Sequence, residues 1–269
     1  MSNTFDIKRF WNYFKWDLRN ARNNYLLSLV ICCATPLIMF LLYELFNLIF
    51  GNTFDGFKVG HVMAFVLAIF IVELTFPAKA YGRVTEKRYG SEWTLIPAST
   101  LEKTLSIILI SCVVLPVCFF SMLALWDILL GSLFTGSYGE PIVTRIGSLW
   151  SEFTSVLTND LEGLQSIFGA PIICGWFSGI LTFTLGAMIF KKGKVGKTIL
   201  ASMLVGLIFS TILTLVNFSD FGGIFGYLST ADDPEKAIRG LKIYIYTSNG
   251  ITLAALIAGI YLRIRTIKH

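Results

Sequence analysis

Charged side chains are scarce in this 269-residue chain. Asp, Glu, Lys and Arg together make up 14% of it, whereas soluble domains carry about 25%. Hydrophobic residues make up 55%. So few charged groups are unusual for a protein whose whole surface meets water. The composition therefore predicts a membrane protein.

The residues and motifs of enzyme active sites are also rare. The chain has only two histidines, His61 and His269, no His-Glu-x-x-His pair for zinc and no Gly-x-Ser-x-Gly nucleophile elbow. Residues 193–198 end like a Walker sequence, but they lack its upstream glycine spacing and preceding strand. We therefore expect no enzyme activity, no metal site and no cofactor bound directly by this chain.

Long apolar runs are what the chain does contain. Six of them are long enough to cross a hydrocarbon core, which needs about 20 helical residues. They cover residues 25–50, 60–78, 104–130, 170–190, 198–218 and 248–262, the last being the shortest. All five cysteines fall inside these runs, so we interpret them as small packing residues rather than as a disulfide framework or metal cluster.

The basic residues divide unevenly between the two sides that six spans define. The N-terminal segment and the connection between spans two and three carry five each, the connection between spans four and five carries four, and the C-terminus three. These are 17 of the 22 Lys and Arg residues. Because cytoplasmic loops retain Lys and Arg, both termini are predicted to be cytoplasmic. The net charge of +5 then follows from topology, and we expect no nucleic-acid partner.

Residues 5–22 have a helical pattern. Ile7, Phe10, Trp11 and Phe14 share one face, while the basic residues occupy another. This pattern predicts an amphipathic interfacial helix on the bilayer surface, and a merely basic juxtamembrane segment is the alternative. The expected fold is an all-α membrane protein in which this helix precedes six transmembrane helices within a single domain, residues 1–269.

The longest polar interval in the first half of the chain covers residues 79–103. Ser99 and Glu102 match a capping box, so a helix should start at Ser99 and run into the third span. Upstream, residues 81–89 are expected to form a short basic helix that ends at Gly90. Together these signals predict a helix-turn-helix elbow below the membrane. A solvated loop that carries positive-inside charges is the alternative.

Three acids lie within the predicted spans: Glu44, Glu73 and Asp127. An ionisable group at the centre of a span costs about 2.5 to 3.5 kcal/mol on insertion scales, so each acid is a possible pathway residue. Glu44 and Asp127 lie near the outer interface, where solvation is the alternative, and Glu73 could pair with Lys79. Two external segments, 131–169 and 218–247, complete the expected topology.

These features resemble the permease subunits of ABC-2 type transporters, particularly the compact bacterial ones with about six spans. The resemblance rests on the amphipathic helix, on EKRYGSEWTLIPASTLEK between spans two and three, and on the external excursion between spans five and six. Residues 95–99, Leu-Ile-Pro-Ala-Ser, followed by Leu-Glu-Lys at 101–103, look like the Leu-x-Leu-Pro-x-Ser and Glu-Lys pattern of such permeases.

The resemblance implies an exporter subunit in the bacterial inner membrane, with ATP bound only by a partner. Its partners would be an ABC ATPase subunit, a second permease subunit, the same or related, and the lipid bilayer. The candidate ATPase-coupling residues are Glu86, Lys87, Arg88, Glu92, Trp93, Pro97, Ser99 and Glu102. The alternatives are a non-transporting membrane docking or regulatory protein and an ion-coupled secondary carrier that uses Glu73.

Overall fold

The computed structural model describes residues 5–51, 57–158, 165–220 and 234–267. Every regular element in these ranges is helical, which confirms the predicted all-α class for the described part of the chain. In chain order the elements are α1 (Ile7–Cys33), α2 (Thr35–Phe50), α3 (Lys58–Ala80), η1 (Gly82–Thr85), α4 (Lys87–Leu95), α5 (Thr100–Leu109), η2 (Ile110–Val114), α6 (Leu115–Leu133), α7 (Ile142–Thr158), α8 (Gln165–Ile189), α9 (Lys194–Asp220) and α11 (Pro234–Thr266).

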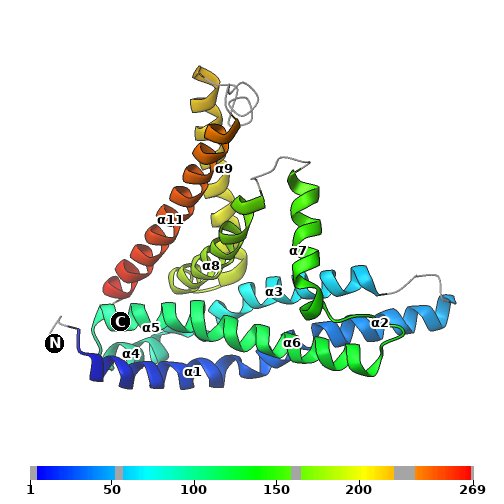
Figure 1. Ribbon diagram of the computed structural model, residues 1–269. Helices are drawn as coiled ribbons and strands as arrows, with labels where there is room; N and C mark the ends of the chain where they lie inside the picture. The colour runs from blue at the N-terminus through cyan, green and yellow to red at the C-terminus, as the bar shows by residue number, and fades with distance from the viewer. Residues whose placement is uncertain (1–4, 52–56, 159–164, 221–233, 268–269) are drawn as a thin grey trace.

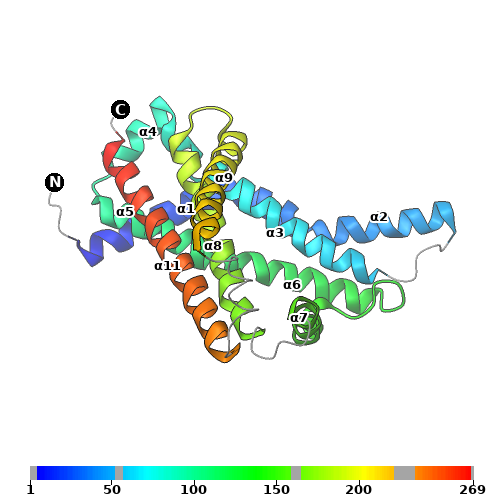
Figure 2. The same ribbon diagram turned by 90° about the horizontal axis from the view of Figure 1, so that it is seen from above.

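The helices form two groups (Figure 1). α1, α2, α3, α5 and α6 run roughly along one direction, whereas α8, α9 and α11 rise from them at a steep angle. Seen from above, α8, α9 and α11 lie over one half of the first group, on the side where both termini and α4 are found (Figure 2). The segment 131–169, which is predicted to be external, contains α7, and its residues 159–164 lie outside the described ranges.

α1 and α2 follow one another nearly in line (Figure 1). They are separated only at Ala34, because Pro36 has no N–H to donate to the carbonyl of Cys32. The Thr35 hydroxyl donates to that carbonyl instead, at 2.6 Å. Together the two helices make a rod of 44 residues, Ile7–Phe50, which is about 66 Å long at the usual helical rise. That is roughly twice the thickness of a hydrocarbon core.

The separate surface helix predicted over 5–22 is not found, because these residues are the first half of this rod. The buried stripe of α1 consists of Phe10, Tyr13, Asp17, Ala21 and Tyr25. This stripe packs against α3 and α5, and such packing holds the N-terminal half of α1 on the axis of the first span. Ile7 and Trp11, which belong to the stripe predicted to face the membrane, lie outside this packed stripe and are exposed.

The elbow between α3 and α5 consists of η1 and α4. The helix expected over 81–89 is wrong in its bounds: Glu86 is extended (φ −83°, ψ 139°) and interrupts it, and Gly90 lies inside α4 instead of ending a helix. Burial of Trp93, which is 3% exposed, explains the difference, since an apolar anchor one turn past Gly90 stabilises the helix through it.

α5, η2 and α6 form one continuous helical run, Thr100–Leu133. Its predicted start is confirmed: Ser99 Oγ accepts from the backbone N–H of Glu102 at 3.3 Å, and the Glu102 carboxylate accepts from the Ser99 N–H at 2.8 Å. The π-helical turn η2 directly precedes Pro116. A π-bulge relieves the lost hydrogen bond and the steric clash that proline imposes on the preceding turn.

Five helical segments in the described residues are long and apolar enough to cross a membrane: Ile7–Phe50, Gly60–Ala80, Thr100–Leu133, Gly169–Ile189 and Lys242–Thr266. They overlap predicted spans one to four and six. The remaining predicted span, 198–218, lies within α9 and stays a prediction. The external segment predicted over 218–247 is partly helical, because α11 already begins at Pro234, while residues 221–233 lie outside the described ranges.

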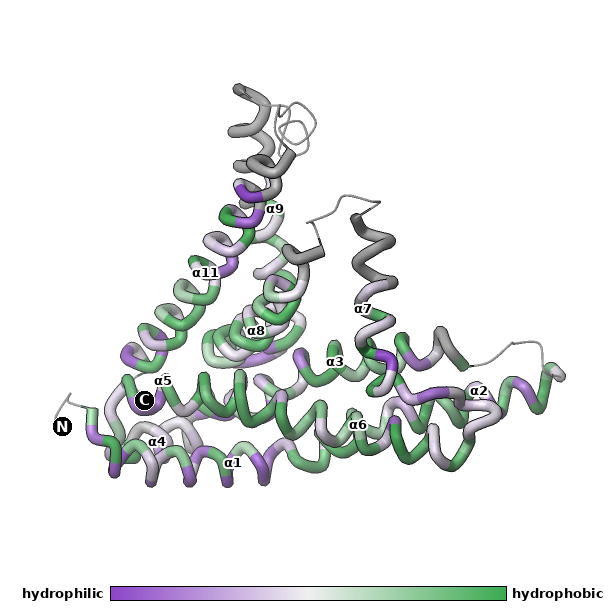
Figure 3. The backbone as a smooth tube through the Cα atoms, in the orientation of Figure 1, coloured by the Kyte–Doolittle hydropathy of each residue, from purple (hydrophilic) through white to green (hydrophobic). Residues whose placement is uncertain are grey.

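The surface of the spanning helices is apolar. Figure 3 shows hydrophobic residues along α2, α3 and α6, whereas hydrophilic residues recur along the N-terminal half of α1 and at the C-terminal end of α11. Leu48, Val117 and Leu125 are each more than 60% exposed. A soluble protein rarely presents so continuous an apolar surface, and lipid chains would cover it without cost. The structure is thus that of a multi-pass membrane protein.

Candidate functional site

The elbow lies at the end of the molecule where α1 begins and α11 ends (Figures 1 and 2). We call this region, which comprises α1 up to Asn24, η1, α4 and α5, the basal end. Within it, Arg83 of η1 donates to Asn24 of α1 at 3.0 Å. Lys194, in the first turn of α9, donates to the Gly82 carbonyl and so joins the basal end to the second group of helices. In that second group, Arg263 of α11 donates to the Met188 carbonyl of α8 at 2.9 Å.

Trp93 faces the interior of the basal end. Its indole N–H donates to the Tyr13 hydroxyl of α1 at 3.2 Å. The Lys103 ammonium of α5 lies 4.3 Å from the centre of the indole ring and donates to the Trp93 carbonyl at 2.9 Å. Trp93 therefore connects α4 to both α1 and α5, and its burial removes it from the surface that a partner could touch.

Glu102 is also internal, with no exposed surface. Its carboxylate accepts from the Arg9 guanidinium at 2.7 and 2.8 Å, from the Asp6 N–H at 3.0 Å and from the Ser99 N–H. Burial alone would raise the pKa of Glu102, but these hydrogen bonds and the Arg9 charge outweigh it and lower the pKa to about 2. Glu102 therefore fixes the start of α5 against α1 as a permanently ionised group.

A buried acid that sequence analysis did not single out lies at the centre of the basal end. Asp17 is 1% exposed and accepts from the Ser106 hydroxyl at 2.7 Å. It precedes Tyr25, where the first predicted span (25–50) begins, by about two helical turns, so it lies outside that predicted span. Burial raises the pKa of Asp17 to about 7, although the Ser106 hydrogen bond and the Lys103 charge oppose this shift.

The pKa of Lys103 is shifted in the opposite direction to that of Asp17. Burial lowers the pKa of its ammonium to about 8, and the nearby Asp17 charge opposes the change. We call Tyr13, Asp17, Trp93, Lys103 and Ser106 the buried joint, because together they tie α1, α4 and α5. The signal that could have revealed the joint is Asp17 itself, an acid on the same helical face as Tyr13, Ala21 and Tyr25.

Fewer of the predicted coupling residues are shown to be exposed than the sequence suggested. Glu86, Glu92, Leu95 and Pro97 are exposed, and Leu95 is 76% accessible. We call these four residues the ridge. Ser99 is half-buried and acts as the N-cap of α5. Lys87 and Arg88 belong to α4, and their side chains lie outside the described part of the structure. The predicted coupling residues thus divide into an exposed ridge and an internal pair, Trp93 and Glu102.

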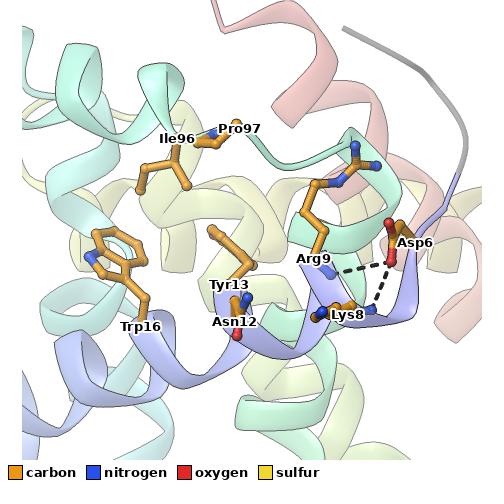
Figure 4. A pocket seen from close by; sticks show the side chains of 8 residues that line it. All are labelled: Asp6, Lys8, Arg9, Asn12, Tyr13, Trp16, Ile96 and Pro97. Carbon is orange, nitrogen blue, oxygen red and sulfur yellow. Dashed lines mark hydrogen bonds between the residues drawn. The ribbon is translucent and has the colours of Figure 1, made fainter.

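A pocket of about 490 Å³ lies beside the ridge, between α1 and the loop before α5 (Figure 4). Tyr13 and Trp16 of α1 face Ile96 and Pro97 of the loop, and Lys8 and Asn12 extend the α1 side. Trp16 is 39% exposed and the ring centres of Tyr13 and Trp16 are 5.9 Å apart. The pocket therefore offers aromatic and proline surfaces next to a cation.

The three acids in the spans lie apart from the elbow residues. The Glu73 carboxylate packs against α8 so closely that a Cβ added at Gly179 would meet its Oε1 at 1.7 Å. Lys79, which was considered as its partner, donates to Ser28. Glu44 has a buried oxygen, Oε1, with no hydrogen-bond partner among the described residues.

Asp127 has a structural role in the C-terminal half of α6. It is fully buried, accepts from the Tyr138 hydroxyl at 2.9 Å and accepts from the Val143 N–H at 3.0 Å. Val143 is in the first turn of α7, where a carboxylate satisfies a free N–H and the helix dipole favours negative charge. Asp127 therefore caps α7, and the ring of His61 packs 4.0 Å from that of Tyr138.

Comparison with protein-family models, curated proteins and solved structures gives no match for this chain. Its function must therefore be argued from its own residues. Within the described ranges, no group of three or more His, Cys, Asp and Glu side chains could hold a metal ion. The basal end, with its ridge, pocket and buried joint, is the strongest candidate site.

Proposed function

We propose that this chain is the membrane-spanning permease subunit of an ATP-driven exporter and that a separate ATPase subunit drives it through the elbow. The observation that carries the proposal is the connection between the ridge and the buried joint. A partner that contacts Leu95 and Pro97 touches the outer side of a segment whose inner side, Trp93, is bonded to α1 and α5. A displacement of α4 would thus move two spanning helices together.

The same proposal assigns the orientation. The basic residues of the N-terminal segment, the elbow, the α8–α9 turn and the C-terminus would face the cytoplasm of a bacterial inner membrane. The contact from Lys194 to Gly82 supports this grouping, because it joins two of the four basic segments. Six spans, including 198–218 in α9, and a second permease subunit, the same or related, complete the proposed transporter. A lipid-like, glycan or peptide substrate would be exported.

Co-purification from the native host tests the proposal. Tagged chain solubilised in mild detergent should bring down an ATP-binding subunit, and Leu95→Glu should reduce the amount recovered. Ile7→Glu is the matched control, because Ile7 is also 76% exposed but lies on α1, away from the ridge. Recovery of a partner that does not bind ATP would favour a docking or regulatory protein, and absence of any ATP-binding partner would refute the proposal.

A further inference from the structure

The pocket lies outside the span that is predicted to start at Tyr25. Trp16, the lining residue of α1 nearest to that span, precedes Tyr25 by nine residues, which is about 14 Å along a straight helix. Even if α1 were tilted by about 40°, the extreme for spanning helices, about 10 Å would remain along the membrane normal. The headgroup layer on each side is only about 5 to 8 Å thick. A lipid headgroup is therefore too far away to fill the pocket.

Apolar side chains are nevertheless exposed around it. Ile7 and Trp11 are 76% and 52% exposed on the same stretch of α1, and Leu95 is 76% exposed on the other side of the pocket. Apolar groups that project into water beyond the membrane are typical of a protein-binding surface. Aromatic walls such as Tyr13 and Trp16 are also the residue types on which binding energy concentrates.

The charge around the pocket specifies the partner further. Lys8 lies in its wall, and exposed Lys15 and Arg19 continue the same face of α1. The acid in the wall, Asp6, is the N-cap of α1 and keeps its negative charge there. The exposed acids of the ridge, Glu86 and Glu92, belong to α4 and its N-cap, on the other side of the pocket. A segment that lies along α1 therefore meets an excess of positive charge on that side, which favours carboxylates on the partner there.

We propose that this pocket receives a large apolar side chain, flanked by Asp or Glu, from the surface of the ATP-binding partner. The apolar group would lie between Trp16 and Pro97, and the flanking carboxylates would face Lys8, Lys15 and Arg19. The identity of the partner rests on the proposed function. The chemistry of the docking segment rests on the pocket alone.

Site-directed photocrosslinking in the native host tests the inference. A benzophenone amino acid is placed at Asn12 in the pocket, at Leu95 on the ridge and, as the control, at Phe50, which is 62% exposed at the opposite end of the molecule (Figure 1), and the adducts are identified by mass spectrometry. The expected result is an adduct at Asn12 with an acidic, apolar-containing peptide of an ATP-binding subunit, which is absent at Phe50. Lys8→Glu should lower its yield by about two- to five-fold, as loss of one rim charge pair does, whereas Lys8→Arg should not.

The possible outcomes distinguish failure of the pocket assignment from failure of the proposed function. An ATP-binding adduct at Leu95 without one at Asn12, or an adduct at Asn12 with lipid only, overturns the pocket assignment and leaves the proposed function intact. An adduct at Asn12 with a protein that does not bind ATP overturns the identity of the partner. If neither position crosslinks to an ATP-binding protein, the proposed function fails.

Discussion

The buried joint should make the stability of the protein depend on pH through Asp17. Burial raises the pKa of this carboxyl to about 7 in the folded chain, from an ordinary value of 3.8. Between these two values the folded chain holds a proton that the unfolded chain releases. Stability is therefore greatest at low pH, falls as the pH rises through this window, and is constant once Asp17 is ionised in both states.

The expected loss of stability follows from the pH range between the folded and unfolded pKa values of Asp17. Each pH unit between the two pKa values is worth about 1.4 kcal/mol, so the wild type should lose about 3 kcal/mol between pH 5 and pH 7. Glu102 contributes little to the change in stability between pH 5 and pH 7, because its pKa of about 2 keeps it ionised in the folded chain and its ordinary value of 4.5 keeps it largely ionised in the unfolded chain.

Lys103 has the opposite effect on stability, in a higher pH range. Between pH 8 and 10.5 the unfolded chain keeps the Lys103 proton that the folded chain has released, so stability rises with pH in that range.

Asp17→Asn separates this contribution from all others. The amide cannot ionise, yet its oxygen can still accept from the Ser106 hydroxyl. Chemical unfolding of the detergent-solubilised protein, followed by tryptophan fluorescence at pH 5 and pH 7, should show a loss of about 3 kcal/mol for the wild type and almost none for the variant. Glu92→Gln, an exposed acid of the elbow, controls for the loss of one charge. Equal losses in wild type and Asp17→Asn would refute the reasoning.

Three further changes address other contacts. Gly186→Ala would place a Cβ 2.0 Å from Thr198 Oγ1 and should destabilise the α8–α9 pair by about 1 to 3 kcal/mol in thermal unfolding, and adding Thr198→Ala should restore only part of the stability, because the Cβ of residue 198, 2.8 Å from the added Cβ, remains. Asp127→Ala removes the cap of α7 and should accelerate hydrogen exchange at the Val143 amide, with Asp127→Asn intermediate because its amide has one acceptor oxygen instead of two. Trp93→Phe loses the bond to Tyr13 at a cost of about 1 kcal/mol and should leave recovery of the ATPase unchanged, a result opposite to that expected for Leu95→Glu.

The sequence predicted local features well where one segment determines the outcome. Ser99 and Glu102 are three residues apart, so their capping box depends only on the local chain, and the structure has it. Pro36 interrupts the first span for an equally local reason, the missing N–H. The apolar runs also became helices, because a helix satisfies its backbone hydrogen bonds within its own segment.

The structural features that the sequence did not predict depend on tertiary contacts. The sequence predicted a membrane-facing stripe that includes Ile7 and Trp11, but it did not predict that α5 packs against the neighbouring stripe, which contains Tyr13 and Asp17. Gly90 looked like a helix end, but α4 continues to Leu95. In both cases a residue distant in sequence makes the decisive contact: Ser106 is 89 positions from Asp17, and Tyr13 is 80 positions from Trp93.

The two groups of helices meet at the elbow through Lys194 in the α8–α9 turn and Gly82 in η1. Gly82 leaves no free space there, because an added Cβ would lie 3.1 Å from the Lys194 ammonium nitrogen. Burial lowers the pKa of Lys194, and the nearby negative charge of Glu86 opposes this shift. If a partner displaces α4, η1 must move with it, since Glu86 is the single residue between them. The displacement would then reach α1 and α5 through the buried joint and α9 through Lys194. The elbow is thus a short segment from which polar contacts extend to both groups of helices.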